Sequence, residues 1–597
     1  MKISTPTLKT ITPDSENIKW ENFSVADCNE ARNTGAHFNI AYKHFDDLCC
    51  HFHHAWFRYH PEEAVDVGVY SFADKLRSYE HDDIGALISL LQKMLSALEE
   101  LNPARLDQNR QIDYKIIKGA ISIELHDLEE NDWRYRNPLD YVPVNAIYQL
   151  LIHPNDNVHS AIKRRLEKIP EYLRGAKVML SQYPERVVRE WTVTARDIAF
   201  TGTEFIRGLE RHPLVTAKFE NPARLQPLFD AAAAALYDFA TYLETDVMPK
   251  AEGKFASGGY RLHRLINEKH FLDTSAEKIL NFGERLVEET EKALLLQSEK
   301  ICGEHDIKKA LDIVRSQHPD ASQLLDCYRK KMQAAHAWLL EADIITVPEK
   351  QSLKVQQTPV FLRDVIPFAA YEPPLPQEKE QHGLYYVTTE EDEALLAEHN
   401  QFSIDLTSVH EAFPGHHLQF VIANQNNVSN ITRILHASAC MYEGWALYCE
   451  QLAFEQGLYN KKEHKFILLR DRLWRALRII IDVKIHTGQF SYNDAVDLLV
   501  EKLGFDVSQA QSEISWYSNS AATPLCYAIG REMIIKARDI IMRQDTGPDE
   551  TGIGDKEKLK SFHDRLLSQG SIALPLIIQS VFGEPVWQAV HDEIFTD

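Results

Sequence analysis

The sequence predicts a mainly α-helical protein of two lobes with a small β element. Three segments carry apolar residues at three- and four-residue spacing, the pattern of amphipathic helices: Ile84–Leu101, Asp230–Glu244 and Ser275–Leu296. The 597 residues show no low-complexity linker, charge block or internal repeat at which the chain would divide. We therefore expect one unit over residues 1–597, with an N-terminal helical lobe at about 1–225 and a second helical lobe at 226–597.

Two shorter segments can be interpreted from local pattern. Cys49-Cys50-His51-Phe52-His53-His54 has residue types that bind metals. No second Cys or His group follows it at zinc-finger distance, and apolar residues continue at helical spacing, so a buried amphipathic helix is the better interpretation. The alternating run Leu384–Thr388 is the best candidate strand.

The most distinctive segment is Val-His-Glu-Ala-Phe-Pro-Gly-His-His-Leu-Gln at 409–419, followed by Tyr-Glu-Gly-Trp-Ala-Leu-Tyr at 442–448. A hydrolytic zinc takes about three protein ligands, usually His nitrogens and a carboxylate oxygen, and keeps one position open. His410, one of His416 or His417, and Glu443 would supply them for one zinc ion. Glu411, next to the first ligand, is placed to act as the general base.

The spacing of these His residues differs from the usual HExxH motif, in which two His lie one helical turn apart. On a straight helix, His416 would lie roughly 600° and about 9 Å from His410, so the pair would not share one ion. Pro414 removes a backbone donor and clashes with the carbonyl four residues earlier, which is that of His410. We therefore expect a helix with two residues looped out, with His416 as the preferred second ligand and His417 as the alternative.

Further candidate residues lie downstream. Arg478, Asp482 and His486 repeat at four-residue intervals and would share one helical face. An ion-paired helix surface is one interpretation. The apolar flanks favour a second one, in which Arg478 and His486 are buried and line a cleft.

The strings HEAFPGHHLQ (410–419) and EGWALYCEQL (443–452) resemble the bacterial family known as domain of unknown function 885, whose members look like zinc metallopeptidases. The resemblance extends to Tyr371–Pro374, to the row from Arg478 to His486, and to Tyr527 with Gly530. It covers most of the chain. A wider similarity is to helical gluzincins such as angiotensin-converting enzyme and the thermostable carboxypeptidases.

These resemblances imply roles for several residues. In helical gluzincins the third ligand is a Glu a couple of dozen residues after the second His, and Glu443 follows His416 by 27 residues. Tyr527 or His486 would stabilise the oxyanion, and Arg531 would clamp a substrate carboxylate. Tyr385 and Tyr386 would bind substrate backbone by strand addition, with a small structural hairpin as the alternative.

Composition limits the partners. The chain has 65 basic and 88 acidic residues, a net charge of −23, which argues against nucleic acid as a partner because phosphate binding needs a basic surface. Residues 1–20 lack the apolar core of a signal peptide, and no segment is apolar enough to span a membrane. The eight Cys show no CxxC, which suits reduced thiols, so we expect a cytoplasmic protein.

The sequence therefore predicts a zinc metallohydrolase, most simply a peptidase of the carboxypeptidase or dipeptidase type acting on short peptides. A zinc-dependent amidase acting on a non-peptide amide would use the same residues. A non-catalytic helical scaffold is a third possibility, against which the intact Glu411 argues. A dinuclear iron protein is excluded by the sequence, since none of the 26 His follows a Glu by three residues.

Overall fold

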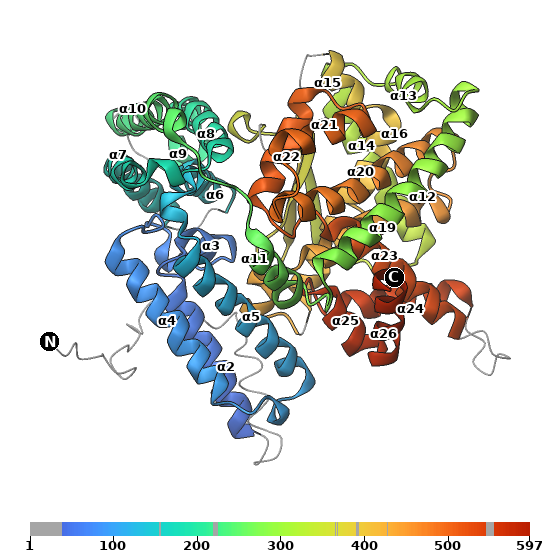
Figure 1. The fold of residues 1–597 in the computed structure, drawn as a ribbon, viewed down its shortest axis with the longest axis horizontal. Coiled ribbons are helices and arrows are strands. Elements are labelled where there is room, and N and C mark those ends of the chain that lie inside the picture. The colour runs from blue at the N-terminus through green and yellow to red at the C-terminus, as the bar shows by residue number, and fades with distance from the viewer. Residues whose placement is uncertain are drawn as a thin grey trace.

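The computed structural model describes residues 39–596 except 154–156, 219–224, 364–365, 367, 390–392, 427 and 545–553. Residues 1–20, on which the expectation of no signal peptide rests, lie outside this range. The fold is mainly α-helical with one small sheet, as predicted. Figure 1 shows two helical lobes, with α11 (Gly258–Arg264) running between them. Among the described helices, none combines the length and apolar character needed to cross a bilayer.

Within the described residues, the regular elements of the N-terminal lobe are helices. They are α2 (Asn39–Trp56), α3 (Pro61–Asp66), α4 (His81–Glu99), α5 (Gln108–Glu130), α6 (Val144–Ile152), α7 (Val158–Gln182), α8 (Arg189–Gly208), α9 (Pro213–Lys218) and α10 (Gln226–Tyr242). The segment Cys49–His54 lies within α2, where His53 is buried and hydrogen-bonds the carbonyl of Cys49 at 2.8 Å. This segment forms the helix that its apolar spacing predicts.

The second lobe contains the sheet and the longest described helix, α12 (Ala276–Cys302). Its elements after α11 are α12 (Ala276–Cys302), α13 (Ile307–Arg315), α14 (Leu324–Ala342), β1 (Gln351–Gln357), β2 (Ala369–Glu372), β3 (Gln381–Val387), α15 (Glu393–Glu398), α16 (Gln401–Glu411), α17 (His416–Gln425), α18 (Ile431–Leu435), α19 (Ala439–Glu455), α20 (Lys462–His486), α21 (Tyr492–Leu503), α22 (Val507–Asn519), α23 (Cys526–Gln544), α24 (Asp555–Leu567), α25 (Leu574–Phe582) and α26 (Glu584–Phe595).

The boundary between the lobes lies later than the predicted residue 225. Helix α10 packs on α7 and α8 in the N-terminal lobe (Figure 1). Its buried residues, among them Phe229, Leu236 and Phe239, belong to the same hydrophobic core as Leu166 and Ile206. The amphipathic pattern correctly predicts this helix, but such a pattern does not indicate which lobe receives its apolar face.

The three predicted helices all form, with small differences at their ends. They correspond to α4, to α10, and to α12, which Ser275 begins by accepting a hydrogen bond from the backbone N–H of Lys278. The predicted strand Leu384–Thr388 overlaps β3 and extends one residue beyond its end. Strand β3 is the central strand of a mixed sheet in the order β1–β3–β2. Strand β1 pairs with β3 in parallel and β2 pairs with it antiparallel, with Tyr371 opposite Tyr385.

A close crossing of α19 and α23 supports the centre of the second lobe. The two helices meet at Gly444 and Gly530, where there is no room for a side chain. A Cβ on Gly530 would lie 2.0 Å from the carbonyl oxygen of Cys440, and a Cβ on Gly444 would lie 2.5 Å from the carbonyl carbon of Gly530. The two glycines therefore set how closely these helices approach.

We expect Gly530→Ala to separate α19 from α23 and to lower the free energy of unfolding by about 1–3 kcal/mol, the usual cost of overpacking. Gly85→Ala in α4 is the matched control, because nothing lies within 4 Å of its added Cβ. The control should be neutral or more stable, since Ala favours a helix interior by roughly 0.5–1 kcal/mol. Denaturant unfolding of both variants measures the difference, and equal stability would contradict the close crossing.

Candidate metal centre

Three side chains converge between α16, α17 and α19. His410 lies at the end of α16, His416 at the start of α17 and Glu443 in the first turns of α19. The Nε2 atoms of His410 and His416 lie 3.5 and 3.4 Å from Oε2 of Glu443. One ligand atom from each of the three residues lies within 4.8 Å of the others. The structure thus brings together the set His410, His416 and Glu443 predicted from the sequence.

The chain achieves this by inserting two residues between consecutive helical turns. The N–H of Gly415 donates to the carbonyl of Val409 at 3.0 Å, and that of Leu418 donates to Ala412 at 3.4 Å. Both bonds span six residues instead of the four of an α-helix. A Cβ on Gly415 would lie 1.9 Å from the carbonyl oxygen of His410, so only glycine fits this position.

The predicted distortion is therefore present, and it is larger than a bulge. Helix α16 ends at Glu411 and a separate helix begins at His416. Trp445 of α19 fixes the connection by donating its indole N–H to the carbonyl of Pro414 at 2.8 Å. The Glu-Gly-Trp string thus places one candidate ligand and holds the segment between the other two.

His417 points away from the cluster and is not the second member of it. Its Nε2 lies 2.8 Å from Oε1 of Gln351, and its Nδ1 lies 3.2 Å from the hydroxyl of Tyr371. Burial lowers the pKa of His417 to about 3, so this imidazole is neutral. The sequence left His416 and His417 open as the second candidate ligand. The hydrogen bonds of His417 to residues of β1 and β2 leave His416 in that place.

Glu450 is a site residue that the sequence analysis missed. One of its carboxylate oxygens lies 2.7 Å from Nδ1 of His410, and both side chains are buried. The bond holds a proton on Nδ1 and directs Nε2 to the cluster as the candidate ligand atom. Burial opposes protonation of His410, but the neighbouring Glu443 and Glu450 carboxylates outweigh it and raise its pKa to about 10. Glu450 follows Glu443 by seven residues on one helical face, a spacing that would have indicated it.

Glu411 and Tyr527 share one cavity with the three converging residues. This cavity has a volume of about 360 Å³. Burial, reinforced by the Glu443 and Glu450 carboxylates, raises the pKa of Glu411 above its ordinary value. Burial and the Glu443 carboxylate also raise the pKa of the Tyr527 phenol, so it keeps its proton. A base with a raised pKa and a protonated hydroxyl donor thus line the same space.

The donor set fits a metal ion. Oε2 of Glu443 is buried without a hydrogen-bond partner although it lies between two imidazoles, and two His nitrogens with one carboxylate oxygen match a catalytic zinc site. A second group, His270, Cys440 and Cys526, has metal-binding residue types and is also fully buried. There, the two sulfur atoms lie 2.9 Å apart in a thiol hydrogen bond, and neither Cys lines one of the cavities around the candidate centre.

The strand beside the centre is β2, and this corrects the prediction for Tyr385 and Tyr386. Both tyrosines lie in the central strand β3 with exposures of 0% and 1%, and the hydroxyl of Tyr386 bonds to that of Tyr148. They are inaccessible to a substrate because helices pack on both faces of this strand: Tyr385 contacts Tyr328 of α14, and Tyr386 contacts Tyr148 of α6. Ala369, Ala370 and Tyr371 of β2 line the cavity instead, and within the described residues no further strand pairs with the outer side of β2.

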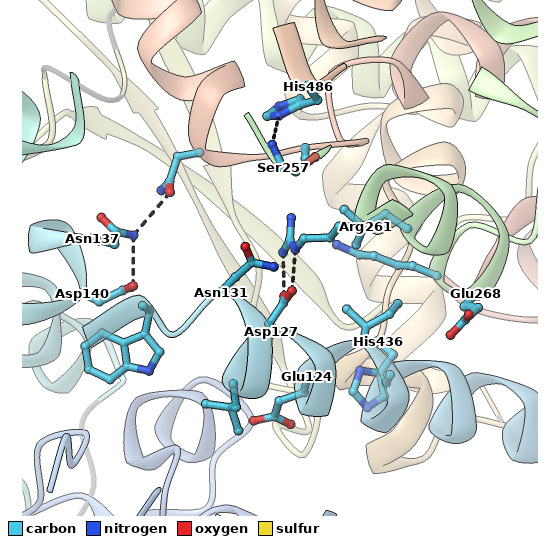
Figure 2. Close-up of a pocket in the computed structure, with 18 of the residues that line it drawn as sticks. Glu124, Asp127, Asn131, Asn137, Asp140, Ser257, Arg261, Glu268, His436 and His486 are labelled. Carbon is cyan, nitrogen blue, oxygen red and sulfur yellow. Dashed lines mark hydrogen bonds and ion pairs between the residues drawn. The ribbon is translucent and has the colours of Figure 1, made fainter. Parts of the chain in front are cut away.

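His486 does not face the cluster either. Figure 2 shows it on the wall of a different cavity, of about 580 Å³, opposite Ser257. Its Nδ1 accepts the backbone N–H of Ser257 at 3.2 Å, and its Nε2 lies 3.1 Å from the carbonyl of Tyr517. Both ring nitrogens are thus bonded to backbone, and burial lowers the pKa of His486 to about 4. The expected oxyanion role is therefore unsupported for His486, and Tyr527 is left as the donor.

Arg478 does line the metal cavity, and its guanidinium lies 4.5 Å from the ring centre of Tyr527. It donates to the hydroxyl of Tyr517 at 2.7 Å and to Glu513 at 3.0 Å, while its Nη1 is buried without a partner. Arg531 lies elsewhere, in a neighbouring cavity, where it is bonded to Glu532 and Gln451. Of the two arginines, Arg478 and not Arg531 therefore lies in the cavity of the three converging residues.

Asp482 positions the segment that carries Tyr527. Its two carboxylate oxygens accept the backbone N–H groups of Ala522 and Leu525 at 3.2 and 3.1 Å. The side chain is fully buried, and burial raises its pKa to about 7 although the two N–H groups oppose the shift. The row from Arg478 to His486 therefore anchors the connection between α22 and α23.

We expect Asp482→Asn to change how stability depends on pH. Because the pKa of Asp482 is near 4 when unfolded and about 7 when folded, its contribution to stability falls as pH rises from about 4 to about 7 and is constant above that. Asn does not titrate. The difference in unfolding free energy between wild type and variant should change across this window by up to about 4 kcal/mol. A difference that is constant with pH would contradict the assignment.

Comparisons with known proteins agree with this fold. The model of the family described as "Bacterial protein of unknown function (DUF885)" matches residues 61–581. A solved structure from Shewanella oneidensis, described as a candidate lipoprotein of unknown function, is 20% identical with a TM-score of 0.71, covering 90% of this chain and 99% of its own. Another candidate lipoprotein, from Colwellia psychrerythraea, is 16% identical with a TM-score of 0.73, covering 93% and 100%. No curated protein matches. Since the family model spans most of the sequence, this chain belongs to the DUF885 family of bacterial proteins of unknown function.

Proposed function

We propose that this protein is a zinc-dependent hydrolase that cleaves short peptides, of the carboxypeptidase or dipeptidase type. The observation that carries the proposal is the convergence of His410 Nε2, His416 Nε2 and Glu443 Oε2 in a cavity that also holds Glu411. Two imidazoles and one carboxylate are a common donor set for catalytic zinc. The resemblance of the motifs to those of helical gluzincins supports the same class of enzyme.

Two residues of the cavity, Glu411 and Tyr527, would have separate roles in the reaction. Bound zinc would supply Lewis acidity for the scissile carbonyl and for a water molecule. Glu411 would take a proton from the attacking water and pass it to the nitrogen of the leaving amine, so that the carboxylate is regenerated. Its raised pKa suits both steps, because a group that titrates closer to neutral pH accepts and returns a proton readily. Tyr527 would donate its hydroxyl to the oxyanion as the carbonyl becomes tetrahedral.

The outer edge of β2 favours a peptide as the substrate. This edge lines the metal cavity, and a peptide in extended form would add to it as a further strand through backbone hydrogen bonds. A cavity of about 360 Å³ is at the small end of ligand-binding pockets, which suits a short peptide. The buried Nη1 of Arg478 offers a donor for a substrate carboxylate in the same space.

We also propose that the protein acts in the cytoplasm. The Cys residues in the described part of the chain are free thiols, which suits a reducing compartment. The two structural neighbours are described as candidate lipoproteins, and a lipid-anchored protein would be found in the cell envelope. Cell fractionation distinguishes the two locations.

We expect Glu411→Gln to retain one zinc per chain and to lose at least about 100-fold in turnover of a pooled dipeptide and tripeptide library, because Gln accepts no proton. His410→Ala should lose both zinc and activity. Glu288→Gln is the matched control, since this exposed residue on α12 pairs only with Lys292. Metal content and hydrolysis are measured on the same samples.

Full activity of the Glu411→Gln variant would contradict the mechanism. Zinc binding without turnover of any peptide would favour hydrolysis of a non-peptide amide. Absence of bound zinc from wild type would favour the non-catalytic scaffold.

We expect Glu450→Ala to weaken zinc binding by roughly 10- to 100-fold, because Nδ1 of His410 loses the acceptor that orients the imidazole. Glu450→Gln should recover part of this affinity, since its amide oxygen still accepts the Nδ1–H bond. Competition with a chromophoric chelator gives both affinities. Unchanged zinc affinity in Glu450→Ala would show that the carboxylate does not support the ligand.

A further inference from the structure

The cavity that Arg531 lines is bounded by α19, α20 and α23 and has a volume of about 240 Å³. It adjoins the candidate metal centre. Its charged lining is mostly basic and comes from five residues: Lys465, Arg472, Arg475, Arg531 and Lys536. The acidic side chains that line it are Glu450 and Glu532. This excess of positive charge contrasts with the net charge of −23 on the whole chain. A local concentration of cations in an acidic protein indicates an attraction for anions.

Carboxylates outside the lining pair with two of the five cations, Arg475 with Asp471 at 3.5 Å and Lys536 with Glu593 at 2.7 Å, but part of the remaining positive charge is unmatched. Glu450 is bonded to His410 at 2.7 Å. Glu532 is shared by two guanidinium groups, with Arg472 at 3.1 Å and Arg531 in direct contact. Lys465 forms no ion pair with any described residue. Burial, together with Arg531 and Arg472, lowers the pKa of Lys465, which shows that the cations crowd one another.

Several donors in this cavity also lack acceptors. Nε of Arg472 and Nε of Arg475 are buried without a hydrogen-bond partner, and Nη1 of Arg475 has only the Asp471 carboxylate, at 3.5 Å. A buried donor left without an acceptor costs about 1–3 kcal/mol, so a bound group with several acceptor atoms would stabilise the cavity. The oxygens of phosphates and carboxylates are such acceptors, and the planar guanidinium fork matches them in pairs.

We propose that this cavity binds one small oxyanion, a phosphate or a carboxylate, between Lys465, Arg472 and Arg531. The volume of about 240 Å³ is many times the roughly 10–15 Å³ of such space that one water needs, which is enough for a small oxyanion. The family resemblance implies that Arg531 binds a carboxylate. In the structure Arg531 lines this cavity and not the one that contains Glu411. Binding here does not depend on the proposed hydrolase activity.

The position of the cavity connects it with the metal centre. Glu450 and Arg475 line both cavities, so each contributes to the wall between them. Gln451, which is bonded to Arg531, lies next to Glu450 on α19. A bound oxyanion would therefore lie on the opposite side of the carboxylate that orients His410.

Isothermal titration of the full chain at constant ionic strength tests the proposal, with inorganic phosphate in one arm and acetate in the other, both against a sodium chloride background. We expect saturable binding with a stoichiometry of one for at least one of the two oxyanions. Phosphate binding alone would identify a phosphate site, and acetate binding alone a carboxylate site. Lys465→Gln and Arg472→Gln should each weaken binding at least tenfold, and Arg472→Lys should weaken it less than Arg472→Gln.

Lys502→Gln is the matched control, because this lysine pairs with Glu291 away from the cavity and its loss should leave binding unchanged. Circular dichroism and melting without added anion establish that each variant is folded. Absence of saturable binding of either oxyanion to wild type would overturn the proposal. Equal affinity in wild type, Lys465→Gln and Arg472→Gln would overturn the assigned location.

Discussion

The candidate centre depends on one backbone device, the insertion of two residues between α16 and α17. Two hydrogen bonds that span six residues replace the regular helical pattern, and the carbonyl oxygens of Val409 and His410 approach Gly415 too closely for any side chain. If residues 410–416 continued as one straight helix, His410 and His416 would lie about 9 Å apart along its axis and would not converge. The bond from Trp445 to Pro414 holds the insertion against α19, so the third candidate ligand and the connection are fixed by the same helix.

The geometry of the candidate centre also depends on how the surrounding helices pack. The crossing of α19 and α23 at Gly444 and Gly530 brings Glu443 and Tyr527 to one cavity, and Asp482 of α20 anchors the start of α23 through two backbone N–H groups. Close packing of this kind leaves a site little freedom to rearrange. Side chains that are buried for structural reasons, such as Asp482, therefore also determine where the chemical groups lie.

Much of the fold and the centre could be predicted from the sequence because the signals were local. Helical periodicity indicated α4, α10 and α12, and the Pro-Gly pair indicated the break between the ligands. The alternatives left open and the wrong predictions concern residues whose contacts come from distant parts of the sequence. His416 and His417 are neighbours in the sequence. His417 is kept out of the cluster by hydrogen bonds to Gln351 and Tyr371, which belong to strands far away in the sequence. Likewise the backbone of Ser257 and Tyr517 binds both ring nitrogens of His486. Tyr328 and Tyr148, from two helices of other parts of the chain, pack against Tyr385 and Tyr386. Sequence spacing places a residue on a face but does not show what packs against it.

X-ray absorption at the zinc edge of the zinc-loaded protein tests the central claim most directly. If His410, His416 and Glu443 hold the ion, the spectrum will show one zinc per chain surrounded by nitrogen and oxygen alone, with the multiple scattering of two imidazoles. Zinc–thiolate bonds are longer, at about 2.3 Å, and give a separate sulfur shell. A sulfur shell would place the ion at His270, Cys440 and Cys526 instead. Either that result or a failure of the protein to retain zinc would contradict the proposed zinc site.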